Sequence, residues 1–116
     1  MDDPQAITPR DLADRLARGE PLSVLDVRED VERAFAAIAI PETAADLHVP
    51  MNQVPSRLAE VREASARGPT VVYCHHGVRS GMVADWLTRQ GVPGVLNLDG
   101  GIDAWSLEVD PRVRRY

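Results

Sequence analysis

The chain has 116 residues, of which 44% are hydrophobic and 27% charged, as in an ordinary folded protein. This length predicts one domain over residues 1–116, large enough to bury a core. The 13 basic and 18 acidic residues give a net charge of −5, which argues against nucleic acid as a partner. All the basic residues are arginine, so lysine Schiff-base chemistry and the phosphate-loop lysine are excluded.

The chain contains a single cysteine, Cys74, and therefore no internal disulfide. The N-terminal segment MDDPQAITPR has neither the basic start nor the apolar stretch of a secretion signal. No apolar run approaches the roughly 20 residues that cross a bilayer. We therefore expect a reduced cytoplasmic protein with no membrane partner.

The first predicted helix begins at Thr8 and Pro9, a favourable N-cap followed by a first-turn proline. Gly19 is typical of a helix end. The branched apolar run at 22–27 then predicts a buried parallel strand, with charged residues where it ends.

The next pair of elements is less regular. The apolar residues Val31, Phe35 and Ile38 favour a helix over 30–38. Pro41 and its small or polar neighbours indicate an irregular passage. The segment 47–50 predicts a short second strand.

The rest of the chain alternates regularly between helix and strand. Helical spacing covers 56–67 and 80–90, and apolar runs at 70–74 and 94–98 predict two further strands. A last helix is expected within 100–109. Strands that alternate with helices indicate an α/β fold, with a parallel sheet covered on both faces.

Several other features of the second half are expected to be structural. The helix at 80–90 has an apolar face that consists of Met82, Val83, Trp86 and Leu87. Trp105 is predicted to lie in the core, and the tail 111–116 on the surface. The turn at 99–101 contains two glycines, which would let it pass close to a neighbouring loop.

Cys74 ends the third predicted strand, and ligands of open parallel sheets bind beyond such strand ends. The loop after it leads into the helix start near Ser80, so loop N–H groups and the positive helix end can converge on an anion. That environment favours a thiolate, which is the nucleophilic form of cysteine. Gly77 would allow a left-handed backbone, and Arg79 would offer a permanent cation to an oxyanion. A lone cysteine after a strand is more often an inert core residue, but such a residue needs no loop of this kind.

His75 and His76 are predicted to be walls of the pocket rather than metal ligands. Adjacent histidines are expected to point apart, and no second cysteine or suitably spaced histidine completes a ligand set. A protonated histidine here would further favour the thiolate. His48 is interpreted as a surface or packing residue.

Three motifs together resemble the single-domain rhodanese family of sulfurtransferases. They are VLDVRE at 24–29, CHHGVRS at 74–80 and NLDGGIDAW at 97–105, in the order and approximate spacing of that family. The closing residues also resemble the rhodanese domains of enzymes that activate ubiquitin-like sulfur carriers. The resemblance implies a three-layer α/β/α fold with a central, mostly parallel sheet of about four to five strands.

The resemblance also implies a reaction cycle and a set of site residues. Cys74 would take sulfur from a donor such as thiosulfate to form a persulfide, and then pass it to cyanide, a thiol or a protein acceptor. No cofactor or metal is implied. The predicted substrate- and persulfide-binding loop consists of His75, His76, Gly77, Val78, Arg79 and Ser80. Asp26 and Arg28 are expected to brace neighbouring loops behind the site.

The sequence departs from the family pattern after the first strand. The usual Gly-His falls on Ala36 and Ala37, and a few extra residues precede 47–50. We therefore carry no family role over to 39–46. We expect this departure to alter loop geometry or partner choice rather than the chemistry.

Two other functions remain open. The fold also occurs as a non-catalytic binding or regulatory module, although the intact Cys74 and Arg79 argue against that class. An oxyanion phosphatase or arsenate reductase is disfavoured because such loops generally have one residue more between the cysteine and the arginine.

Overall fold

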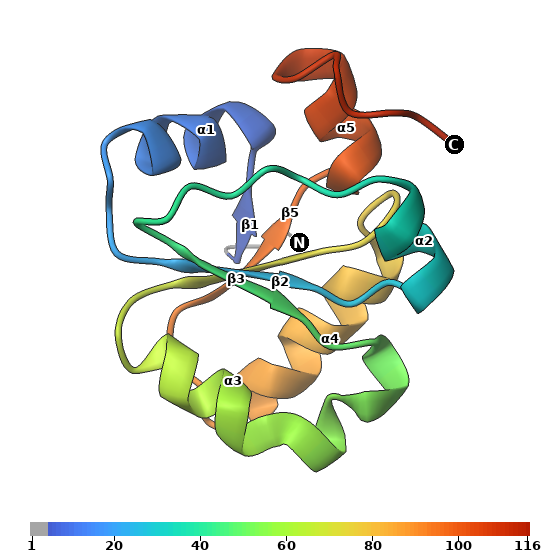
Figure 1. Ribbon diagram of the computed structural model, residues 1–116. Helices are drawn as coiled ribbons and strands as arrows, with labels where there is room; N and C mark the ends of the chain where they lie inside the picture. Colours follow the sequence, from blue (N-terminus) through green and yellow to red (C-terminus); the bar gives the residue numbers. More distant parts are fainter. Residues whose placement is uncertain (1–4) are drawn as a thin grey trace.

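The computed structural model describes residues 5–116. The first four residues of the N-terminal segment, for which no secretion signal was expected, lie outside the described residues. Five strands and five α-helices alternate along this part of the chain (Figure 1). In order they are β1 (Ala6–Ile7), α1 (Pro9–Ala17), β2 (Ser23–Asp26), α2 (Asp30–Phe35), β3 (Ala45–His48), α3 (Leu58–Ser65), β4 (Thr70–Tyr73), α4 (Val78–Arg89), β5 (Val95–Leu98) and α5 (Gly101–Glu108). Two short 3₁₀ turns, Met51–Gln53 and Pro55–Arg57, precede α3.

The five strands form one parallel sheet in the order β1-β5-β4-β2-β3, which confirms the α/β prediction. Strand β4 is the central one, and Val72 on it pairs with Leu25 of β2 and with Asn97 of β5. All four residues of β4 are buried. The strand that leads to Cys74 is therefore held from both edges and both faces.

Helices cover both faces of the sheet, which gives the expected three layers (Figure 1). Helices α1 and α5 lie on one face, where Leu12 and Trp105 belong to a buried cluster. Helices α3 and α4 lie on the other face, where Val61 and Leu87 belong to a second cluster. No helix within residues 5–116 is long and apolar enough to span a membrane.

The helix expected at 30–38 is shorter than predicted. It ends at Phe35, and both Val31 (77% exposed) and Phe35 (41% exposed) face outward. The backbone is extended at Ala36, whose carbonyl accepts a 2.6 Å hydrogen bond from Arg28. Because the chain is straightened there, Ile38 reaches the core from outside the helix and is 1% exposed.

Other differences concern edges and helix faces. The two-residue strand β1 was not predicted, because Ala6 and Ile7 are too few to form a pattern. Met82 was expected on the buried face of its helix but is 57% exposed. Helix α4 begins at Val78, two residues before the predicted start, so Arg79 and Ser80 belong to its first turn.

Candidate active site

Cys74 follows the central strand directly, and its side chain is 1% exposed. Gly77, three residues later, is the N-cap of α4 and has a φ of 100°. This left-handed conformation turns the chain from the strand into the helix within three residues, and glycine adopts it without steric cost. The thiol therefore lies at the positive end of a 12-residue helix.

Three donors point at the sulfur of Cys74. The backbone N–H groups of Gly77 and Ser80 lie 3.2 and 3.3 Å from Sγ, and the Ser80 hydroxyl lies 3.2 Å from it. Hydrogen bonds to the charged form of a group favour that form. The loop therefore has the geometry of an anion cradle with the sulfur at its centre.

The Ser80 hydroxyl has two acceptors but only one hydrogen. Its Oγ lies 2.6 Å from Oδ1 of Asn97 on β5, and the Asn97 amide is oriented by its donation to the Gly77 carbonyl at 3.2 Å. When Cys74 is a thiol, the hydroxyl can donate to Asn97 and accept from the S–H group. When Cys74 is a thiolate, the hydroxyl can rotate its hydrogen to the sulfur. Asn97 thus supports an adjustable donor. Although Asn97 begins the motif at 97–105, the sequence alone gave it no role at the sulfur.

A Ser80→Ala variant is expected to transfer sulfur at least about tenfold more slowly, because a hydrogen bond to a charged group contributes about 1.5–3 kcal/mol. Sulfite release from thiosulfate measures the effect. Ser65→Ala is the matched control, since it also removes a buried hydroxyl, one that bonds to Thr70 at the other end of β4. Equal rates for the two variants would contradict a role for Ser80 at the sulfur.

The turn before α5 packs against the loop, as predicted from its two glycines. Gly101 has a φ of 63°, and a Cβ built on it would lie 2.5 Å from the carbonyl oxygens of both Cys74 and His75. The next two N–H groups, those of Ile102 and Asp103, donate to these carbonyls at 2.9 and 3.1 Å. The active-site loop is therefore fastened to the start of α5 through its backbone.

Arg79 does not point its terminal nitrogens at the sulfur. They bond to the two carboxylate oxygens of Glu32 on α2, at 2.6 and 2.9 Å. This pairing lowers the pKa of Glu32 to about 2, with a further contribution from the Tyr116 hydroxyl, and it raises the pKa of Arg79. The sequence indicated no carboxylate partner for Arg79, because Glu32 is distant in the chain and the pattern of 30–38 is weak. Binding of a donor oxyanion by Arg79 stays a prediction.

The Glu32 carboxylate should make stability pH-dependent. Its folded pKa lies below the ordinary value of 4.5, so its stabilisation is complete above about pH 5 and is lost as the pH falls toward about 2. A Glu32→Gln variant is expected to remove up to about 3 kcal/mol of that pH dependence of the free energy of unfolding. Urea titrations between pH 2 and pH 7 measure it.

Glu60→Gln is the control for the loss of one carboxylate. Glu60 bonds to Arg57 in a solvent-exposed pair, and such pairs contribute little to stability. If both variants reduce the pH dependence of the free energy of unfolding equally, the Arg79–Glu32 pair contributes no more to stability than an exposed pair.

Asp26 and Arg28 form a fully buried ion pair at the end of β2. Two guanidinium nitrogens of Arg28 donate to the Asp26 carboxylate at 2.8 and 2.9 Å. Arg28 also bonds to the Ala36 carbonyl and to the Tyr116 hydroxyl. These contacts join the strand end to α2 and to the C-terminal segment, and the bracing of the loops behind the site by this pair stays a prediction.

The tail was expected on the surface, but it packs against the site. The Tyr116 ring is stacked on His75, with 3.9 Å between centroids and 8° between planes. Its hydroxyl donates to Glu32 at 2.8 Å and accepts from Arg28 at 2.9 Å. Val113 is also buried, and its carbonyl accepts from Ser106. No motif predicted this, since the contacts of Tyr116 lie more than 40 residues away in sequence.

The expectation that His75 and His76 point apart is wrong. Their rings are stacked, with 3.8 Å between centroids, so His75 lies between the rings of His76 and Tyr116. His48 lies elsewhere, and its Nε2 is 2.9 Å from the Arg28 carbonyl oxygen. Both loop histidines follow Cys74 directly in the chain, and their role as walls of a pocket stays a prediction.

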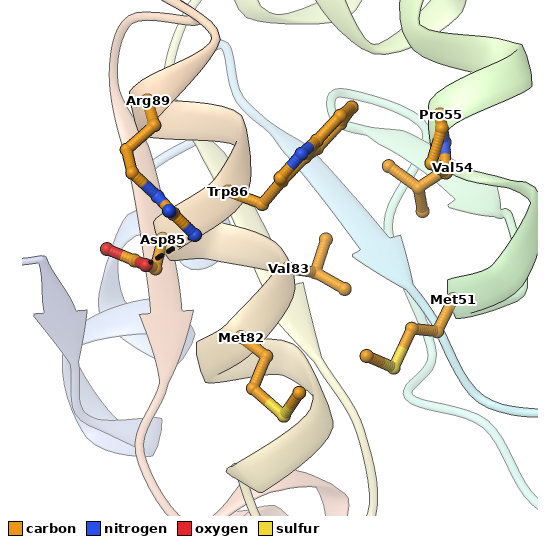
Figure 2. Close-up of a pocket in the computed structure, with 8 residues that line it drawn as sticks. All are labelled: Met51, Val54, Pro55, Met82, Val83, Asp85, Trp86 and Arg89. Atoms are coloured by element: carbon orange, nitrogen blue, oxygen red, sulfur yellow. Dashed lines mark ion pairs between the residues drawn. The ribbon is translucent and has the colours of Figure 1, made fainter.

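A separate apolar groove of about 340 Å³ runs between α4 and the 3₁₀ turns (Figure 2). It is lined by Met51, Val54, Pro55, Met82, Val83, Asp85, Trp86 and Arg89. None of the three donors to Sγ belongs to this lining. The groove is therefore distinct from the sulfur cradle, and it leaves Trp86, which was predicted to be a core residue, only partly buried.

Cys74 lies in a loop between the central strand of a parallel sheet and the start of a helix, which places the chain among α/β proteins with a cysteine in such a loop. Comparison with protein families narrows this class, because the family of the rhodanese-like domain matches residues 8–108. The chain belongs to the rhodanese-like family.

Its relatives include sulfurtransferases of similar length. A sulfurtransferase of Allochromatium vinosum is 37% identical over 82% of this chain and 81% of its own length. The thiosulfate sulfurtransferase GlpE of Pseudoalteromonas translucida is 32% identical over 81% of this chain and 90% of its own. The probable adenylyltransferase/sulfurtransferase MoeZ of Mycobacterium tuberculosis is 33% identical over 95% of this chain, but the match spans only 26% of that longer protein.

Solved structures agree on the fold. A rhodanese-like domain protein from Staphylococcus aureus is 28% identical and has a TM-score of 0.76 over 97% of this chain and 98% of its own. The rhodanese-like domain of the Anabaena Alr3790 protein has a TM-score of 0.77 at 22% identity, over all of this chain and 81% of its own.

Proposed function

We propose that this protein is a sulfurtransferase that carries sulfur as a persulfide on Cys74. The observation that carries the proposal is the set of three donors from Gly77 and Ser80 around the buried Sγ. A thiolate, and the anionic persulfide that follows it, both need such donors where water is excluded. An inert core cysteine needs none of them.

The reaction balances without an external oxidant or reductant. The Cys74 thiolate attacks the outer sulfur of thiosulfate, a new S–S bond forms, and the S–S bond of the donor breaks. Sulfite leaves with the electron pair of that bond. A nucleophilic acceptor then attacks the outer persulfide sulfur, and Cys74 leaves as the thiolate. Protonation of the cysteine is not required at either step.

We take thiosulfate as the donor for the test and cyanide, a small thiol or a protein cysteine as acceptors. The short loop supports a sulfur-sized ligand, because four residues separate Cys74 from Arg79. The charge of Arg79 is largely balanced by Glu32, so we assign donor recognition first to the loop N–H groups. A cytoplasmic location accords with a working free thiol.

Intact-mass measurement tests the proposal. Wild-type protein incubated with thiosulfate should gain the mass of one sulfur atom and release one sulfite, and cyanide should then remove the sulfur as thiocyanate. Protein alkylated beforehand at its single thiol is the control and should gain nothing. Wild type that gains no sulfur, or that instead hydrolyses an aryl phosphate, would overturn the proposal in favour of a binding module or a phosphatase.

A further inference from the structure

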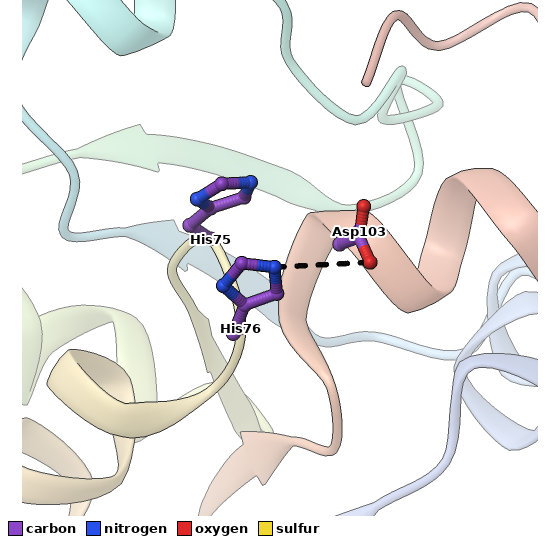
Figure 3. Close-up of side chains that lie close together, drawn as sticks. All are labelled: His75, His76 and Asp103. Carbon is purple, nitrogen blue, oxygen red and sulfur yellow. Dashed lines mark ion pairs between the residues drawn. The ribbon is translucent and has the colours of Figure 1, made fainter. Parts of the chain in front are cut away.

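A second cluster of chemically active side chains lies beside the cradle, formed by His75, His76 and Asp103 (Figure 3). One potential ligand atom from each residue lies within 4.8 Å of the other two. Figure 3 shows the two imidazole rings on the active-site loop and the carboxylate facing them from α5. Nε2 of His76 is 3.8 Å from Oδ2 of Asp103.

His75 contributes an independent observation. Its Nε2 is buried and has no hydrogen-bond partner among the described residues. Buried polar atoms are nearly always satisfied, so an unpaired ring nitrogen on one of the three clustered side chains supports a missing ligand for that side chain. No step of the proposed sulfur transfer uses this nitrogen.

The donor set suits a zinc ion. Two imidazole nitrogens and a carboxylate oxygen are a common three-residue set, which leaves the fourth position for water. Ligands about 2.0–2.1 Å from a tetrahedral ion lie about 3.4 Å apart. The 3.8 Å contact between His76 and Asp103 is close to that spacing, whereas the three potential ligand atoms together lie within 4.8 Å of one another. Because the His75 and His76 rings are stacked, their lone pairs lie in nearly parallel planes, so the exposed His76 ring must rotate out of the stack to share an ion with His75.

The backbone holds the two sides of this cluster in place. The Asp103 N–H group donates to the His75 carbonyl at 3.1 Å, so α5 and the loop keep a fixed distance. Only Oδ1 of Asp103 is engaged by Arg115, at 2.8 Å, which leaves Oδ2 facing His76. Arg115 is therefore a charge that competes with a cation for the same carboxylate.

We propose that His75, His76 and Asp103 form a binding site for Zn²⁺ at the edge of the active-site loop. His75 is the neighbour of Cys74 in the chain, so an ion held there would crowd the approach of a donor or acceptor to the sulfur. The site would make this surface sensitive to free zinc. It is a regulatory position and supplies no step of sulfur transfer.

Zinc binding is best measured in the Cys74→Ser protein, which has no thiolate to bind the metal. Titration with ZnCl₂ in competition with a chromophoric chelator should give one ion per chain. His76→Ala and Asp103→Asn, each added to Cys74→Ser, should weaken binding at least tenfold. His48→Ala removes the only other histidine and should leave the affinity unchanged. Because this protein cannot form a persulfide, the result does not depend on the proposed function.

Two arginine variants make the test specific to the geometry. Arg115→Gln should tighten zinc binding, because it frees Asp103 and removes a nearby positive charge. Arg112→Gln removes the same charge from a pair with Asp110 and should have a much smaller effect. The proposal is overturned if the Cys74→Ser protein binds no zinc, if His76→Ala and His48→Ala bind it equally, or if Arg115→Gln does not tighten binding.

Discussion

Replacement of Cys74 by serine is expected to reduce sulfur transfer more than about a thousandfold, since no other thiol in the chain can take its place. The fold should survive. A serine Oγ can still accept the N–H groups of Gly77 and Ser80, but a hydroxyl neither ionises near neutral pH nor forms a persulfide. Sulfite release and intact mass after incubation with thiosulfate give the two readouts.

Cys74→Ala separates the chemistry from the structure. It should be equally inactive, and it should also be less stable than Cys74→Ser, because the buried N–H group of Ser80 and the partly buried N–H group of Gly77 lose their acceptor. Thermal melts of both variants provide this comparison. Sulfur found on the Cys74→Ser protein would show that the transferred atom is held elsewhere and would remove Cys74 from its assigned role.

The geometry around Cys74 could be predicted because it is local in sequence. Cys74, Gly77 and Ser80 lie within one strand–loop–helix segment, where the spacing itself brings the N–H groups to the sulfur. The parallel sheet also followed from the alternation of apolar runs with helical periods. Both inferences needed only contacts between neighbours along the chain.

The surroundings of the site could not be predicted in this way. Glu32, Asn97 and Tyr116 reach the loop from separate elements, and no periodicity encodes which charged or aromatic residues meet across a fold. Helix α2 shows the same limit: the apolar spacing within 30–38 favoured a helix over that whole segment, yet the Arg28 bond to Ala36 ends the helix. Tertiary contacts overrode local pattern at each of these positions.

Gly101→Ala is the second variant for which we expect a large effect, because the position combines two steric demands. Its φ of 63° is unfavourable for any residue with a Cβ, and that Cβ would lie 2.5 Å from two backbone oxygens of the active-site loop. Backbone atoms cannot yield as a flexible side chain can. The loop would have to move away from α5, and the hydrogen bond from Ile102 to the Cys74 carbonyl would stretch.

Gly91→Ala isolates the clash from the backbone strain. Gly91 has a similar φ of 82°, but nothing lies within 4 Å of its Cβ position. We expect Gly91→Ala to cost about 1 kcal/mol of unfolding free energy, and Gly101→Ala about 3 kcal/mol or more. At a temperature where both variants are folded, only Gly101→Ala should slow sulfite release. If the two variants lose equal free energy of unfolding and release sulfite at equal rates, the contact between α5 and the loop does not set the geometry of the cradle. The placement of Cys74 would then depend on β4 and α4 alone.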